Sequence, residues 1–248
     1  MKNITSNIFH VGLIKEAGNG NSYFVKGDGS SANWLINSPE PTAELLEQLQ
    51  QLGGVDYIFG THRDVVCHVD AMAKHFNAKR IINKLDIEAL PDAEIVLVGD
   101  QEQILADDAN FLAVPAPGHT EGHCMLLYAD RFLFSGDAME VSGDELIVGP
   151  AEWTWQSAEL NIESVRRLAS MTLSCLLPDH GESLQLDSAA LKTRILAAAE
   201  RASSASFDPA ERSRALNIYI GQMRHLGQTE QENKMLAELG KIALHKRD

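Results

Sequence analysis

Residues 62–68 contain four side chains that commonly bind metals: His62, Asp64, Cys67 and His68. The apolar residues 55–59 predict a buried strand before this stretch, and residues 69–76 predict a helix after it. A turn at the carboxyl end of a strand is a common place for chemistry in α/β proteins. The same turn also fits a helix start in which Asp64 is the N-cap and His68 is exposed. Both interpretations stay open for this stretch taken alone.

Three further turns carry candidate ligands. His119 lies in a loop rich in glycine and proline, Asp137 follows a predicted strand at 131–135, and His180 follows another at 173–177. Strand ends of this kind meet at one edge of a fold, so their side chains are expected to lie close together. Imidazole, carboxylate and thiolate groups all bind zinc, and carboxylate-rich sets also suit iron or manganese.

The composition limits the classes of function. The chain has 248 residues, a hydrophobic share of 44% and a formal net charge of -14. Such a surface repels phosphate backbones and anionic membranes, so we expect neither nucleic acid nor a membrane as a partner. The three cysteines form no CxxC pair, and no signal peptide or membrane span is predicted. These features favour a cytoplasmic protein that acts on a small molecule.

The elements that would position the candidate ligands follow from the hydrophobic pattern. Strands are predicted at 8–14, 22–27, 33–37, 78–82, 94–98, 111–114 and 124–128, with helices at 42–52 and 157–169. Residues 140–154 are expected to form a loop, with Trp153 and Trp155 packing or lining a pocket. Residues 1–185 would form the main domain. Residues 186–248 would be a helical extension that covers this domain or joins copies of the chain in a homo-oligomer.

The motifs and their order resemble those of the metallo-β-lactamase fold superfamily. That family has a Thr-His-x-His-x-Asp-His motif after a strand, then a Pro-Gly-His-Thr-x-Gly loop, a Gly-Asp turn and a final Gly-His. This chain has TH at 61–62, PGHTEG at 117–122, LFSGD at 133–137 and LPDHG at 177–181. The resemblance implies an α/β fold, the αββα sandwich, with the site at one edge of its two sheets.

The resemblance also implies two metal positions. His62, Asp64 and His119 would hold the first, and His68 and His180 the second, with or without Cys67; Asp137 would bridge the two. The first motif departs from the family pattern, because Asp64 replaces the second histidine. Without a gap, Val66 and Cys67 replace the aspartate and the last histidine. One extra residue would instead bring His68 into the last histidine's place and Cys67 into that of the aspartate.

We therefore expect one or two divalent metal ions, zinc first, with iron or manganese as alternatives. The expected activity is hydrolysis of a small ester, thioester, lactone or amide by a metal-bound hydroxide, with Asp137 and His180 as catalytic residues. The main alternative is a non-hydrolytic binding or regulatory module with a degenerate site. An iron oxidoreductase on the same fold is a third hypothesis that no residue singles out.

Overall fold

The computed structural model describes residues 1–245 and contains two β-sheets. The first has the strand order β1 (Lys2–Asn3), β2 (Ile8–Ile14), β3 (Gly20–Val25), β4 (Trp34–Ile36), β5 (Tyr57–Phe59), β6 (Lys79–Asn83) and β7 (Ile95–Leu97). The second has the order β14 (Leu184–Gln185), β13 (Cys175–Gly181), β11 (Phe132–Ser142), β10 (Cys124–Tyr128), β9 (Asp108–Pro115) and β8 (Gln103–Leu105), and β12 (Glu145–Val148) pairs with β11. Neighbours from β4 to β7 are parallel, as are β11 and β13.

The alternation of side chains along the strands explains why the two sheets pack together. Tyr23 and Val25 of β3, with Trp34 of β4, belong to a buried cluster that also contains residues of the second sheet. Phe24, between Tyr23 and Val25, and Leu35, next to Trp34, belong to a different cluster on the opposite face. Successive side chains of a strand point to opposite faces, so β3 and β4 bury both of their faces in apolar layers.

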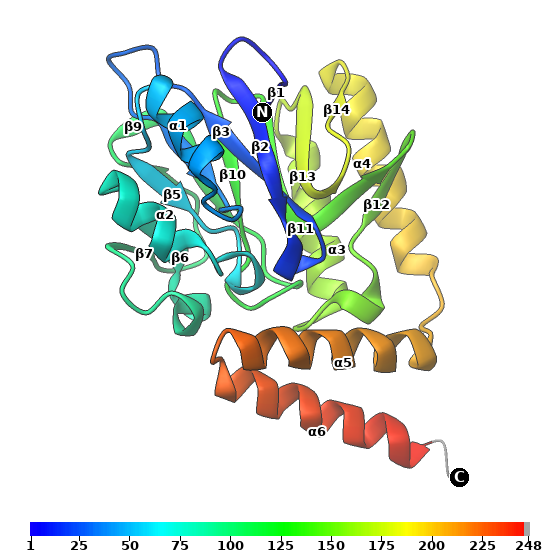
Figure 1. The fold of residues 1–248 in the computed structure, drawn as a ribbon. Helices are drawn as coiled ribbons and strands as arrows, with labels where there is room; N and C mark the ends of the chain where they lie inside the picture. The colour runs from blue at the N-terminus through cyan, green and yellow to red at the C-terminus, as the bar shows by residue number, and fades with distance from the viewer. Residues whose placement is uncertain (246–248) are drawn as a thin grey trace.

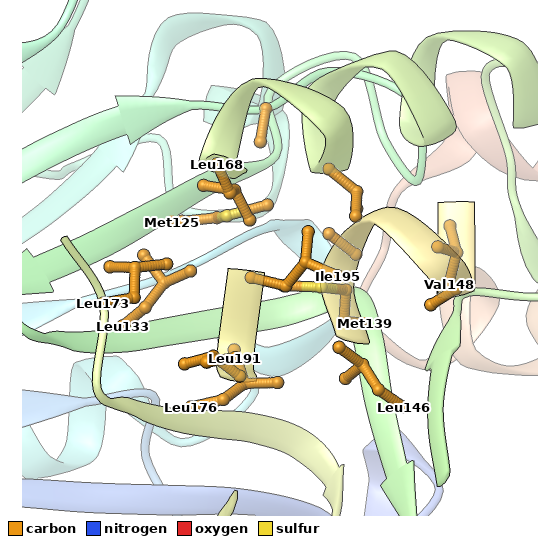
Figure 2. Packing of buried hydrophobic residues seen from close by; sticks show 14 of the residues in the cluster. Met125, Leu133, Met139, Leu146, Val148, Leu168, Leu173, Leu176, Leu191 and Ile195 are labelled. Carbon is orange, nitrogen blue, oxygen red and sulfur yellow. The ribbon is translucent and has the colours of Figure 1, made fainter. Parts of the chain in front are cut away.

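Helices cover the outer faces of both sheets (Figure 1). The helices α1 (Ala43–Gln51) and α2 (Val69–Phe76) pack on the first sheet, and α3 (Ala158–Arg167) packs on the second. The helix α4 (Ser188–Ser204) covers the second sheet beside α3, with Leu191 and Ile195 among its buried side chains. Figure 2 shows these two residues among Leu133, Met139 and Leu176 of the sheet. The predicted αββα sandwich is confirmed.

The last two helices lie across one end of the sandwich. The chain leaves α4 and forms α5 (Pro209–His225) and α6 (Thr229–His245), which run beneath the layers in Figure 1. Asp208 caps α5, and Pro209 occupies its first turn. The appended helical segment is thus present, while α4, which also falls in 186–248, packs as the outer layer of the sandwich. None of the helices within residues 1–245 has the length and apolar character that a membrane span requires.

Two strands run further than predicted. The sequence pattern placed their ends before Asp137 and His180, whereas β11 continues to Ser142 and β13 continues to Gly181. The two strands pair in parallel with register shifts around Gly136. The prediction was wrong because polar residues and glycine commonly end strands. Local sequence does not show that β11 and β13 pair with each other beyond these residues. Strands β8 and β12 were also missed, the latter inside the predicted loop 140–154.

Candidate metal centre

Four donor atoms from different parts of the chain face one another. The Nε2 atoms of His62 and His119 each lie 3.3 Å from Asp137 Oδ2. Asp64 Oδ2 lies 3.4 Å from His119 Nε2 and 3.8 Å from His62 Nε2. The side chains are 0% exposed at His62 and 14% at Asp137. The structure therefore brings together four of the six predicted metal ligands in a nearly closed pocket.

Each donor is held by the local structure of its segment. His62 directly precedes a short 3-10 turn, Arg63–Val65, that places Asp64 on the same side. His119 lies in the loop between β9 and β10, and Asp137 lies in the irregular part of β11. The backbone N–H of Asp137 donates to His123 Nε2 at 3.1 Å. A side chain at Gly136, where φ is +55°, would collide with this imidazole, so glycine is required there.

Four distances among the donors are close to those around a tetrahedral metal ion. Within residues 1–245 the mutually close ligand atoms form two groups that share His62, one with Asp64 and His119 and the other with Asp137 and Asp179. Zinc bonds to nitrogen and oxygen are about 2.0–2.2 Å long, which puts tetrahedral ligand atoms about 3.3–3.6 Å apart. Three of the four distances above fall in this range, and the fourth, 3.8 Å, is slightly longer. His62 Nε2 and the Oδ1 atoms of Asp64 and Asp137 are also buried without a hydrogen-bond partner. Buried polar atoms of this kind require a partner, and a cation beside the two Oδ2 atoms would supply one to His62 Nε2.

The electrostatics of the pocket also favour a cation. Burial opposes a charge on His62, but Asp137 and Asp64 outweigh it and raise the pKa of this imidazole to about 9. Burial likewise opposes the charge of Asp64, yet His119 and His62 hold the pKa of its carboxyl below the ordinary value. Both partners are thus stabilised in their charged forms. A divalent ion would displace the proton from His62 and would itself balance the negative charge of the two carboxylates.

The second metal position is incomplete. His180 Nε2 lies 3.4 Å from Asp137 Oδ1, but within residues 1–245 His180 belongs to no group of three or more closely spaced ligand side chains. Val66 is 4% exposed and packs in the apolar cluster beneath α1 and α2. Cys67 packs against the small cluster around Val65, where burial raises the pKa of its thiol to about 11. Neither residue replaces the missing aspartate and histidine of the family motif.

His68 lies apart from the other candidate ligands. It occupies the N-cap position of α2, and its Nε2 lies 3.0 Å from Glu16 Oε2. Glu16, Cys67 and His68 form a group of their own, so the structure does not bring His68 together with His180. Asp64 does not cap α2 either, because that helix start has no side-chain cap. The helix-capping interpretation of Asp64 was wrong.

Asp179 is a site residue that sequence reasoning did not single out. Its carboxylate is buried and accepts hydrogen bonds of 2.9 Å from Asn37 Nδ2 and 3.2 Å from the Thr61 hydroxyl. Burial and the neighbouring Asp137 raise the pKa of Asp179 to about 7. The Thr61 hydroxyl oxygen also lies 3.0 Å from His62 Nδ1 and can accept a hydrogen bond from Nδ1–H. In that tautomer Nε2 keeps its lone pair and is available for a metal. The available signal was a carboxylate where the family has glycine, at the end of an apolar strand.

The candidate centre opens into a cavity of about 520 Å³. Asp64, His119, Asp137 and His180 lie on one side of it. The apolar part of its lining comes from β11, from the segment after β12 and from α5; it includes Met139, Pro150, Trp153, Trp155 and Ile218. A cavity of this size fits a small molecule.

Comparisons with known proteins identify the fold. No protein-family model and no curated protein matches the sequence. A metallo-β-lactamase family protein from Thermus thermophilus is 14% identical, with a TM-score of 0.62 over 96% of this chain and 95% of that chain. A metallo-β-lactamase superfamily protein from the archaeon Sulfolobus tokodaii is 16% identical, with a TM-score of 0.56 over 90% and 99%. The protein TTHA1623, solved in a di-iron-bound form, is 21% identical, with a TM-score of 0.58 over 75% and 98%. This chain therefore has the metallo-β-lactamase fold.

Proposed function

We propose that this chain binds one divalent metal ion and hydrolyses a small ester, thioester, lactone or amide. The observation that carries the proposal is that the imidazoles of His62 and His119 each lie 3.3–3.8 Å from the carboxylates of Asp64 and Asp137. Two imidazoles and two carboxylates suit zinc first, and they also suit iron or manganese. A protein of similar fold was solved with two iron ions, which keeps iron among the candidates.

The residues around the donors fit the requirements of hydrolysis. When bound, a divalent cation makes water more acidic and polarises a carbonyl oxygen. His180 lies beside the cation position, with its side chain 34% exposed on the cavity wall. Because it lacks further ligand partners, its imidazole is free to carry a proton to the leaving group as a general acid. Asp137 orients it, since Oδ1 faces His180 while Oδ2 faces the other donors.

The cavity supports a small, mainly apolar substrate. Trp153 and Trp155 form one wall, and Ile218 of α5 contributes another apolar surface. Glu16 and Glu140 also line the cavity, and among residues 1–245 Lys15 is the one lysine or arginine that lines it. With a net charge of -14 on the whole chain, this lining disfavours nucleic acid and other polyanions. A neutral acyl compound therefore fits better than a phosphodiester.

A non-hydrolytic binding module is the second candidate function. It is favoured by one observation, the loss of the second ligand set through Val66 and Cys67. Such a protein would keep the buried donors for a structural metal ion and use the cavity only to bind a ligand. Metal content alone does not separate the two functions, so turnover must be measured on the same preparation.

The test is metal analysis by plasma mass spectrometry together with a substrate panel. The parent protein is expected to hold about one ion per chain and to hydrolyse at least one ester, thioester, lactone or amide. His119→Ala should lose both the ion and the turnover, because it removes a donor 3.3 Å from Asp137 Oδ2. A metal-loaded parent that is inert across the panel would favour the binding module, and a parent without metal would contradict the proposal.

A further inference from the structure

The indole of Trp155 makes a direct contact with one of the proposed metal ligands. Its Nε1–H donates a hydrogen bond of 3.1 Å to Asp64 Oδ2. This is the same oxygen that lies 3.4 Å from His119 Nε2 and therefore faces the proposed cation. A carboxylate oxygen has two lone pairs, so Oδ2 can accept the hydrogen bond from the indole N–H and bind a metal at the same time.

The C-terminal helices hold this indole in place. Tyr219 of α5 stacks on Trp155 with ring centroids 3.9 Å apart and an angle of 18° between the planes. The guanidinium of Arg212, also from α5, lies 5.2 Å from the centre of the Trp155 ring. Arg212 in turn donates to the carbonyl oxygen of Thr154 at 2.8 Å and to Glu238 of α6 at 2.7 Å. Contacts from α5, supported by α6 through Glu238, thus fix the orientation of the Trp155 ring.

The same region is tied to the loops that carry the ligands. The backbone N–H of Trp155 donates to the carbonyl oxygen of His119 at 2.7 Å. Gln228, in the turn between α5 and α6, donates to the carbonyl oxygen of Arg63 at 3.3 Å. Gln228 is 0% exposed. The helical pair is therefore joined to both sides of the candidate centre, next to Asp64 and at His119.

A carboxylate in the position of Asp64 has a particular need for such support. A histidine ligand presents one nitrogen to a metal, and a hydrogen bond to its other nitrogen fixes the ring. Asp64 has two oxygens, and Oδ1 is buried without a hydrogen-bond partner. A donor that selects Oδ2 therefore decides which oxygen faces the pocket, and Trp155 is that donor.

We propose that Trp155 is a positioning residue for the metal ligand Asp64, and that Tyr219 and Arg212 make α5 part of the metal centre. This inference rests on the proposed function only in that Asp64 binds a cation. It does not require turnover. It assigns the C-terminal helices a role in metal affinity that is separate from covering the cavity.

The test measures the affinity of the whole chain for Zn²⁺ by competition with a chelator, and the absorption spectrum of the Co²⁺ form. Trp155→Phe keeps a stacked ring and removes the N–H, and it should weaken Zn²⁺ binding by about 10-fold or more. The Co²⁺ spectrum should change, because the ligand oxygen is no longer fixed. Tyr219→Leu, which keeps the N–H and removes the stacking partner, should weaken binding by a smaller factor.

Trp34→Phe is the matched control, because the Trp34 indole stacks between Tyr57 and Phe111 in the core and its Nε1 has no hydrogen-bond partner among the described residues. It should leave both the affinity and the spectrum unchanged. In an Asp64→His background, a bound imidazole nitrogen has no lone pair left for the indole, so Trp155→Phe should then have little effect. Folding of each variant is verified by its melting temperature.

The outcomes separate the two proposals. A parent that binds Zn²⁺ and a folded Trp155→Phe variant that binds it equally tightly would overturn the positioning role and leave the proposed function intact. An equal loss from Trp155→Phe in the parent and in the Asp64→His background would also overturn it, because the effect would then be structural. A parent that binds no cation would overturn both proposals together.

Discussion

Two residues of one short loop, His62 and Val66, place their side chains in different parts of the molecule. His62 points into the candidate metal centre, where its Nε2 lies 3.3 Å from Asp137 Oδ2. Val66, four residues later, packs into the apolar cluster between the first sheet and its helices. Among the described residues, His62 therefore belongs to groups of closely spaced candidate ligands, whereas His180 contacts Asp137 and belongs to no such group.

The difference indicates that the backbone path, and not residue type alone, decides which side chains of this loop face the candidate centre. A side chain at position 66 contributes to the core, and a Cβ on Gly60 would lie only 2.9 Å from Val66 Cγ1. His68 is next to the expected ligand position in sequence, yet it lies against Glu16. A ligand-type residue near a motif is therefore not sufficient for a ligand.

The largest effect on metal affinity is expected from replacing His62 by alanine, and the same replacement at His68 is the comparison. His62→Ala removes a buried donor and should weaken Zn²⁺ binding by more than about 100-fold, above the range for residues that only support ligands. His68→Ala removes an imidazole that contacts Glu16 and should retain about one ion per chain. Chelator competition and metal analysis measure both variants. Loss of the ion from His68→Ala would contradict the comparison between the two positions.

Much of the fold and part of the site could be predicted from the sequence. Strand 8–14 and the helix at residues 69–76 were predicted with the bounds that the structure has. His62, His119, Asp137 and His180 could be selected because each follows or interrupts an apolar run and fits a motif. Their grouping depends on strand order, which the resemblance implied and local pattern alone did not.

The remainder depends on contacts between distant residues. Glu16 lies 52 positions before His68, and Trp155 lies 91 positions after Asp64. Hydrophobic periodicity reports which face of an element is buried, but it does not report which polar atoms meet across the fold. Asp179 was missed for the same reason, since its partner Asn37 lies 142 positions away.

The next largest effect concerns the open second position. His180→Gln should retain about one metal ion and reduce kcat by about 10²–10⁴-fold, because it removes the proposed proton donor and leaves the four buried donors intact. Metal analysis and steady-state kinetics on the same sample separate these quantities. If His180→Gln instead lowers the metal content, His180 is a ligand and the second position is more complete than its geometry indicates.

A substitution at Val66 tests whether the missing carboxylate can be restored. Val66→Asp should bind no second ion, because its side chain enters the apolar cluster beneath α1 and α2. Loss of apolar burial and desolvation of the carboxyl should lower the free energy of unfolding by about 3 kcal/mol or more. Val66→Ala is the control for lost packing and should cost about 2 kcal/mol. A stable Val66→Asp protein with two ions would show that residue type alone limits the second position.

The smallest effect concerns the Cys67 thiol. Burial, followed by the nearby carboxylate of Glu16, raises its pKa from 9.0 to about 11. The thiol is neutral below the raised value, so near pH 8 the thiolate is about 100-fold scarcer than in a free cysteine. Alkylation by iodoacetamide, followed residue by residue with mass spectrometry, should be slow at pH 8 and accelerate about 10-fold per pH unit up to about pH 11. Because metals bind the thiolate, rapid alkylation near pH 7 would reveal a lowered pKa and restore Cys67 as a candidate ligand of the second position.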